Sequence, residues 1–169
     1  VDFIFESEYI LRFHDPRKFG SILWTDKDPT SHKLIAHLGP EPLSEEFNGD
    51  YLYAKSKKHS LSIKSFIMNN KVVVGIGNIY ANEALFLAGI NPKCKVSRIS
   101  KKRYKILIAS IKKILTKAIT KGGTTLRDYV SGDGLPGYFV NELKVYNRSG
   151  ELCSKCEKKI KTIKQNQRS

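Results

Sequence analysis

Apolar residues in the first 24 positions recur with a period of two, for example at Tyr9, Leu11 and Phe13. That period places successive side chains on opposite faces of a sheet, so we predict strands here. Residues 15–20, DPRKFG, interrupt the pattern with Asp-Pro and a closing glycine, which are typical of a tight turn. Because the alternation begins without a cap or a turn, we expect this segment to be the end of a longer β-domain.

A rigid connector follows at residues 38–43, LGPEPL, where two prolines beside a glycine break any helix or strand. We therefore expect a domain boundary there, with residues 1–38 as the β part and residues 39–137 as a helical part. Glu45 and Glu46 suit the first turn of a short helix, because acidic side chains there complement the helix dipole.

Three helices are predicted in the middle of the chain from apolar residues spaced three and four apart. The first begins near Ser60, and the second spans about residues 79–88. The third begins after Ser100 and is terminated by Gly122. The other face of this third helix is rich in lysine, and its apolar stripe comprises Tyr104, Leu107, Ile108, Ile111, Ile114, Leu115 and Ile119.

Strand-forming residues return in residues 138–169. Tyr138, Val140 and Val145 are β-formers, and the run KKIKTIK at 158–164 alternates basic and apolar side chains. We predict a basic β-hairpin there. Strands at both ends and helices between them predict an α+β fold class.

The charge of the chain is unevenly distributed. Its 169 residues carry a formal charge of +14, with −5 in residues 1–50 and +19 in residues 51–169. A basic C-terminal part favours a polyanionic partner, nucleic acid before an anionic membrane surface; a solvated lysine-rich surface is the neutral alternative. No apolar run approaches the roughly 20 residues of a membrane span. The N-terminus has no features of a secretory signal, and three cysteines make no disulfide framework, so we expect a cytoplasmic protein.

Cys153 and Cys156 have the spacing of two zinc ligands, because C-x-x-C in a turn brings two thiolates onto one metal. They are half of a tetrahedral site. The alternatives are a redox pair or two unrelated thiols. Cys94 precedes the long helix and is interpreted as a bystander.

The motif GIGN at residues 75–78 precedes a predicted helix. Glycines allow a close backbone approach, and a helix N-terminus favours an anion. Asn78 is therefore either an N-cap or a donor to phosphate. Tyr80 stands where a dinucleotide fingerprint needs its third glycine, which excludes that interpretation. A tight turn without a ligand is the alternative, but the flanking lysines favour DNA phosphate.

Arg17 and Phe19 lie together on the predicted turn at residues 15–20. An exposed aromatic can open a base step while a guanidinium takes up the orphaned hydrogen bonds. The alternative places Phe19 in the core and pairs Arg17 with Asp15.

Together these motifs resemble those of the formamidopyrimidine-DNA glycosylase family, bacterial repair enzymes for oxidised purines. The related endonuclease VIII group shares the architecture, but the motifs at 38–43 and 122–129 favour the formamidopyrimidine branch. The resemblance covers the chain in order and is carried by DPRKFG at 15–20, LGPEPL at 38–43, VGIGNIYANE at 74–83, GGTTLRDY at 122–129, DGLPGYF at 133–139, and C-x-x-C at 153–156 with QRS at 167–169.

The resemblance implies three parts: the end of a β-sandwich domain in residues 1–38, a helix–two-turns–helix DNA-binding domain in 39–137 and an incomplete zinc-finger β-hairpin in 138–169. It implies base excision repair by a DNA glycosylase and abasic-site lyase, with damaged double-stranded DNA as the partner. It also implies one structural zinc ion held by Cys153 and Cys156, a monomeric state and no membrane partner.

The resemblance also implies roles for residues already singled out. Asn78 would hold the backbone of the damaged strand, Arg17 would face the base left unpaired by flipping, and Phe19 would wedge the stack. Arg168 would grip the phosphates beside the lesion and act in the final elimination. A DNA-contacting lysine of the family falls near Lys58 and His59, with His59 at the aligned position and Lys58 as its neighbour.

Glu83 also matches the family motif, on the second predicted helix. It would either act on substrate or brace the turn, and the sequence leaves both possibilities open.

Two departures from the family pattern concern the ends of the chain. The family's nucleophile is an N-terminal proline followed by glutamate, whereas this chain starts with Val1-Asp2, and it stops at Ser169, before the second cysteine pair. We therefore expect a piece that does not act alone as a glycosylase. The alternatives are a DNA-binding remnant without catalysis and an endonuclease VIII-like enzyme for oxidised pyrimidines.

Overall fold

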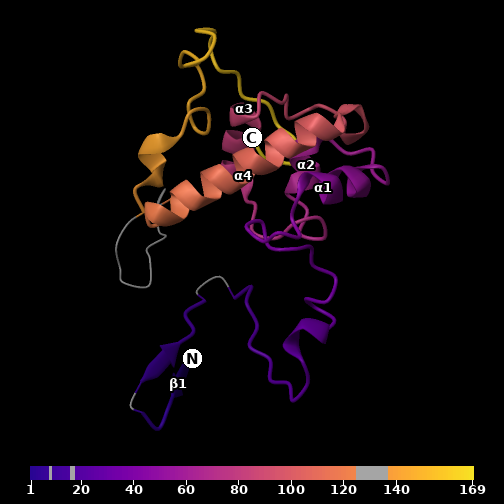
Figure 1. The fold of residues 1–169 in the computed structure, drawn as a ribbon. Coiled ribbons are helices and arrows are strands. Elements are labelled where there is room, and N and C mark those ends of the chain that lie inside the picture. The colour runs from indigo at the N-terminus through magenta and orange to yellow at the C-terminus, as the bar shows by residue number, and fades with distance from the viewer. Residues whose placement is uncertain (8, 16–17, 125–136) are drawn as a thin grey trace. The chain divides into compact units, whose positions relative to one another are not determined.

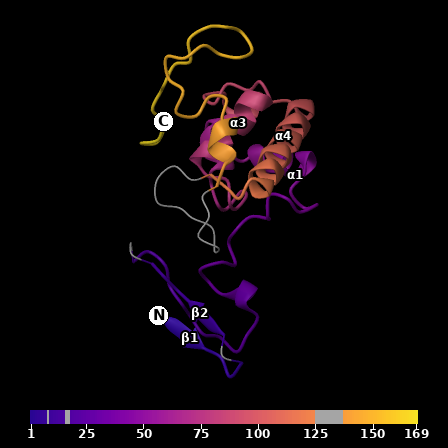
Figure 2. The same ribbon diagram turned by 90° about the vertical axis from the view of Figure 1, so that its left-hand side faces the viewer.

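The protein forms two compact units, Val1–Ala36 and His37–Ser169, and each is described by itself. Figures 1 and 2 show the computed structural model with the first unit in indigo to violet and the second from purple through magenta and orange to yellow. A small antiparallel sheet in the first unit and helices in the second confirm the α+β fold class. The structure describes residues 1–7, 9–15, 18–124 and 137–169.

In the first unit, strands β1 (Asp2–Ile4) and β2 (Ile10–Arg12) pair in antiparallel register. Arg12 Nε and Asp2 Oδ1 form a 2.8 Å ion pair across this ribbon. The predicted strands are confirmed at these positions. The extension of the pattern to residues 21–24 is wrong, since they lie outside any strand. A two-stranded ribbon has no second layer against which further alternating residues could be buried.

The second unit is built from four α-helices and two short 3-10 helices within the described residues. Two of the predicted helices are confirmed closely: the second is α3 and the third is α4. The first is the short α2, which starts at Ile63 because the Ser62 side chain accepts a hydrogen bond from the N–H of Ser65. The bounds are α1 (Gly49–Ser56), α2 (Ile63–Ile67), α3 (Asn78–Leu87), η2 (Val96–Arg98), α4 (Lys101–Thr120) and η3 (Phe139–Glu142); in the first unit, η1 is Pro29–Ser31.

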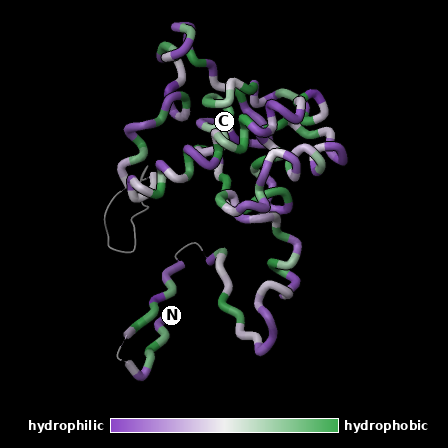
Figure 3. The backbone as a smooth tube through the Cα atoms, viewed as in Figure 1, coloured by the Kyte–Doolittle hydropathy of each residue, from purple (hydrophilic) through white to green (hydrophobic). Residues whose placement is uncertain are grey.

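Helix α4 organises the core of this unit by packing against both α1 and α3. Its apolar stripe is buried from Tyr104 to Leu115, with Ile114 half-buried, whereas Ile119 at its end is exposed. Hydrophobic and hydrophilic residues alternate along the helix in Figure 3, as expected for an amphipathic helix. Tyr104 is fully buried, and its hydroxyl donates to the carbonyl of Val96 at 3.0 Å. No helix in the described part of the chain is both long and apolar enough to cross a membrane.

The helix predicted to start at Glu45 and Glu46 begins later. These residues lie in turns, and α1 starts at Gly49 because the Asn48 side chain accepts hydrogen bonds from two N–H groups of its first turn. A polar cap therefore decides this helix start.

The strand predicted at the start of residues 138–169 is also wrong. Phe139–Glu142 forms a 3-10 helix, and Phe139 and Leu143 are buried beside Ala118 of α4. In a helical turn, apolar side chains four residues apart lie close together and can be buried against one surface. In a strand they would be farther apart, and the described part of this unit has no neighbouring sheet to bury them. The hairpin further on is reduced to isolated bridges, Leu152 with Lys159 and Gln165 with Arg168.

Candidate nucleic-acid interface

The turn before α3 has the geometry of an anion-binding helix start. Gly75 has a φ of +72°, a left-handed conformation that glycine adopts without strain. Gly77 is the N-cap of α3 and has no side chain to bond to the first-turn N–H groups. The alternative of Asn78 as the N-cap is therefore wrong. The start of α3 presents unsatisfied N–H groups and the positive end of its dipole.

Asn78 is the first residue of α3, and its Oδ1 is buried without a hydrogen-bond partner among the described residues. A buried amide oxygen without a partner is costly, and proteins pair nearly all such atoms. Turning the amide by 180° exchanges this oxygen for an NH₂ group, which is a donor for phosphate. The position is consistent with the predicted DNA contact.

Lys64 is one of the lysines flanking the GIGN motif that favoured DNA phosphate in the sequence, but its burial was not predicted. It is only 3% exposed, although it belongs to the five-residue helix α2. Its ammonium donates to the carbonyl oxygen of Ser169, and burial, followed by the positive charge of Arg168, lowers its pKa. The available signal was a lysine among the buried apolar residues Ile63 and Ile67. A buried cation usually has a specific partner or function.

The end of the chain docks on α2 through side-chain amides. Gln165 Nε2 donates to Ser62 Oγ at 3.1 Å, and Asn166 Nδ2 donates to Ser65 Oγ at 3.1 Å. The backbones of Gln165 and Arg168 close a tight turn with bonds of 2.7 and 3.0 Å. These contacts carry the exposed Arg168 to the vicinity of Lys64.

Two of the predicted DNA-contacting residues are brought to one face of the helical unit. The carbonyl oxygen of Ser169, beside Arg168, accepts from Asn82 Nδ2 at 3.4 Å. Asn82 lies one turn after Asn78 on α3, and residues four apart share a helix face. Asn78 and Arg168, which are distant in the sequence, therefore lie along a single surface, and the buried Lys64 holds the Ser169 end of it.

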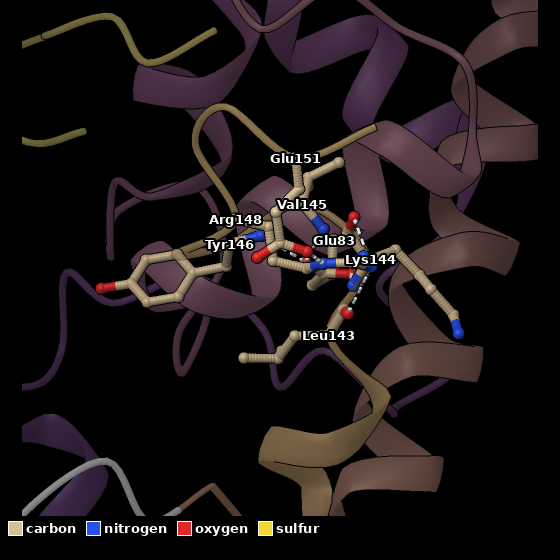
Figure 4. Close-up of polar contacts among 7 residues, drawn as sticks. All are labelled: Glu83, Leu143, Lys144, Val145, Tyr146, Arg148 and Glu151. Carbon is tan, nitrogen blue, oxygen red and sulfur yellow. Dashed lines mark hydrogen bonds and ion pairs between the residues drawn. The ribbon is translucent and has the colours of Figure 1, made fainter. Parts of the chain in front are cut away.

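Glu83 braces the segment after η3. Its carboxylate is buried and accepts three bonds of 2.8 to 2.9 Å from the backbone N–H groups of Lys144, Val145 and Tyr146 (Figure 4). Arg148 supports the same segment by donating to the carbonyls of Leu143 and Lys144, and it pairs with Glu151. This geometry selects bracing for Glu83, since its oxygens already face backbone donors.

The other predicted DNA-contacting residues lie elsewhere. The ring of His59 packs against that of Phe66, with centroids 5.2 Å apart, while Lys58 is exposed in the turn after α1. Phe19, in the first unit, is 80% exposed, so the alternative that places it in a core is wrong. Arg17 lies outside the described residues.

Cys153 and Cys156 lie in a turn suited to thiolate ligands. Hydrogen bonds from the backbone N–H groups of Lys155 and Cys156 lower the pKa of the Cys153 thiol, which favours the thiolate that binds metal. The pair supplies two of the four ligands of a structural zinc site. Across the described ranges, no group of three or more candidate metal ligands is found. Cys94 lies apart, half-buried against the core.

Comparison with known proteins identifies the family of the helical unit. Residues 38–130 match the family described as "Formamidopyrimidine-DNA glycosylase H2TH domain". This chain belongs to the formamidopyrimidine-DNA glycosylase family. The glycosylases of Marinomonas sp. and Idiomarina loihiensis are 56% and 52% identical to it over 170 and 169 residues, covering 100% of the chain. The chain spans only 62% and 63% of those relatives' own length.

Solved structures of family members share the fold. The MutM (Fpg) protein of Thermus thermophilus superposes with a TM-score of 0.88 at 32% identity, over 99% of this chain and 64% of that protein. The Lactococcus lactis Fpg in complex with abasic-site DNA superposes with a TM-score of 0.73 at 38% identity, over 80% of this chain and 49% of that protein. The predicted family is confirmed.

Proposed function

We propose that this chain is the DNA-binding part of a base-excision-repair enzyme. The complete protein would excise oxidised purines, 8-oxoguanine and formamidopyrimidines, and cleave the abasic site by β,δ-elimination. Membership of the family supports the proposal, as does the relative bound to abasic-site DNA. The observation in this chain that carries it is the buried Asn78 Oδ1, which has no hydrogen-bond partner among the described residues, at the start of α3.

In the proposed complex, the surface of Asn78 and Arg168 binds the backbone of the damaged strand, and the buried Lys64 holds Ser169 beside Arg168. The N–H groups of α3 and the Asn78 amide would contact phosphate, and Arg168 would grip the phosphates that flank the lesion. Lys58, or His59 beside it, would add a contact. In the first unit, Phe19 would wedge the base stack and Arg17 would face the orphaned base.

The chemistry proposed for the complete protein follows base flipping. An amine attacks C1′ of the flipped nucleotide, the damaged base departs, and a Schiff base remains. Successive eliminations then break the strand on both sides of the sugar. Arg168, at the phosphates, would act in the last elimination by stabilising the departing phosphate.

A structural zinc ion is part of the proposal. Cys153 and Cys156 would provide two thiolates to it, with the backbone donors of their turn holding the sulfurs in place. The ion would link residues 153–156 to the other ligands.

We also propose that the protein binds damaged duplex DNA as a monomer in the bacterial cytoplasm. Its domains would be divided after residues 38 and 137.

Binding of duplexes with and without 8-oxoguanine or an abasic-site analogue tests the proposal. We expect binding that weakens steeply with salt, because phosphate contacts release counterions. Asn78→Ala should weaken binding about tenfold, through loss of one hydrogen bond to a charged group. Asn141→Ala, at an exposed position away from this surface, is the matched control. Salt-independent binding, or equal losses for the two variants, contradicts the proposal.

Borohydride trapping separates binding from catalysis in this chain. A covalent adduct with an abasic or 8-oxoguanine duplex would show that one of its amines forms a Schiff base. Salt-dependent binding without an adduct would assign these 169 residues a binding role alone.

A further inference from the structure

A small apolar pocket lies next to the cavity lined by Lys64, Asn82 and Ser169, with which it shares Phe86 and Lys155. It has a volume of about 250 Å³ and lies among α3, α4, η3 and the Cys153–Cys156 turn. In Figure 1, η3 lies beside the end of α4. The apolar lining of the pocket, called the floor below, comprises Phe86, Leu87, Ile114 and Phe139.

Lysines surround this floor. The lysines that line the pocket are Lys113, Lys117, Lys144 and Lys155. Lys155 reaches over the Phe86 ring at 4.5 Å and donates to the carbonyl of Phe86, and Lys117 pairs with Glu142 at 2.7 Å.

Two of these lysines have no close partner for their charge in the part of the chain that the structure describes. Lys113 and Lys144 are exposed, and within the described residues their ammonium groups make no hydrogen bond or ion pair. The acids that line the pocket offset them only in part: Lys144 is among the charges that lower the pKa of Glu142, after Lys117. The Glu83 carboxylate already accepts three backbone bonds, and Glu142 is paired with Lys117. The pocket therefore combines an apolar floor with a net positive rim.

We propose that this pocket binds an acidic peptide segment of a partner protein, which inserts one large apolar side chain between Lys113 and Lys144. A volume of about 250 Å³ suits a single side chain, since pockets for drug-sized ligands begin at about 300 Å³. Apolar anchors in such pockets dominate peptide affinity. Carboxylates flanking the anchor complement the lysine rim and speed association.

The pocket favours a peptide over nucleic acid. A DNA backbone would satisfy the lysines but offers no apolar group for a floor made of two aromatic and two aliphatic side chains. None of Asn78, Lys64 and Arg168 lines the pocket, so a bound peptide would leave the proposed DNA contacts of Asn78 and Arg168 unoccupied. The partner would thus join the repair protein to another protein without occupying these contacts.

Fluorescence anisotropy with a labelled peptide in which aspartates flank a single phenylalanine tests the proposal on the whole chain. We expect saturable binding that is lost when the peptide phenylalanine is replaced by alanine. Lys113→Glu combined with Lys144→Glu should weaken binding about tenfold through charge reversal at the rim. Leu87→Gln, at the exposed end of α3, should weaken it about fivefold by making the floor polar.

The control variant combines Lys102→Glu with Lys158→Glu, which changes net charge equally at exposed lysines that do not line the pocket. Retained peptide binding and an unchanged circular dichroism spectrum are expected for it. Binding that ignores the peptide phenylalanine, or equal losses for rim and control variants, overturns the proposal. Loss of duplex affinity in the rim variant alone would instead make this a nucleic-acid surface, and self-association abolished by the rim variant would make it an interface between copies.

Discussion

The buried carboxylate of Glu83 accepts a 2.8 Å hydrogen bond from the backbone N–H of Tyr146, 63 residues further along the chain. The same carboxylate binds the two preceding N–H groups. Helix α3 therefore fixes, through one side chain, the path by which the C-terminal segment leaves η3. That segment carries Cys153, Cys156 and Arg168, so Glu83 links the proposed zinc turn to the DNA-binding helix.

Glu83→Gln should lower the free energy of unfolding by about 2–4 kcal/mol. The amide NH₂ of glutamine would face backbone N–H donors and leave buried donors without an acceptor, each at about 1–3 kcal/mol. Urea denaturation measures the change. Glu151→Gln removes only an exposed ion pair with Arg148 and should cost less than about 1 kcal/mol. Equal effects of the two variants would contradict the bracing role.

Gly75→Ala should cost about 1–2 kcal/mol, because a residue with a Cβ is strained at a φ of +72°. Gly77→Ala is the control two residues away: Gly77 has a φ of −82° and nothing within 4 Å of a new Cβ, so only the poorer N-cap, about 0.5–1 kcal/mol, is expected. Thermal unfolding compares the two. A larger loss for Gly77→Ala would show that the N-cap preference, not the left-handed conformation of Gly75, limits this turn.

Lys64→Met should stabilise the fold, because it removes a buried cation and retains an apolar stem. It should also weaken DNA binding, because the hydrogen bond that holds Ser169 beside Arg168 is lost. The effect on stability depends on pH. Burial lowers the pKa of Lys64 below 10.5, so the unfolded chain binds the extra proton between the two pKa values, and the stability of the unsubstituted chain rises with pH in that window. The stability difference between the two proteins should therefore narrow as pH approaches 10.5. Chemical denaturation across the alkaline range measures it, and a difference that widens would contradict the assignment.

Cys153→Ser or Cys156→Ser should abolish thiolate-to-metal charge-transfer absorption on addition of Co²⁺, a spectroscopic substitute for zinc. Cys94→Ser should leave that absorption unchanged, since Cys94 lies against the core, apart from the other two. A fold that needs the metal would also lose stability on chelation. Equal absorption in all three variants would show that the C-x-x-C pair is not the ligand set.

The sequence determined the parts of this protein whose signals are local. Residues spaced along one face of a helix predicted α4 nearly to its ends, and the turn motif before Asn78 located the start of α3 within one residue. The ordered motifs identified the family. These features depend on side chains within a few positions of one another, where periodicity and turn chemistry act directly.

Only the tertiary structure decided features that depend on distant partners. Tyr138, Val140 and Val145 have strand propensity, but the core beside α4 and the Glu83 carboxylate impose a 3-10 helix and a braced loop on that region. The sequence does not show that the Lys64 ammonium meets the carbonyl oxygen of Ser169, because the two residues are 105 positions apart; the fold brings them together. Local propensities are worth tenths of a kcal/mol, whereas burial and charge-assisted hydrogen bonds are worth about 1–3 kcal/mol each, and so contacts made across the fold prevail.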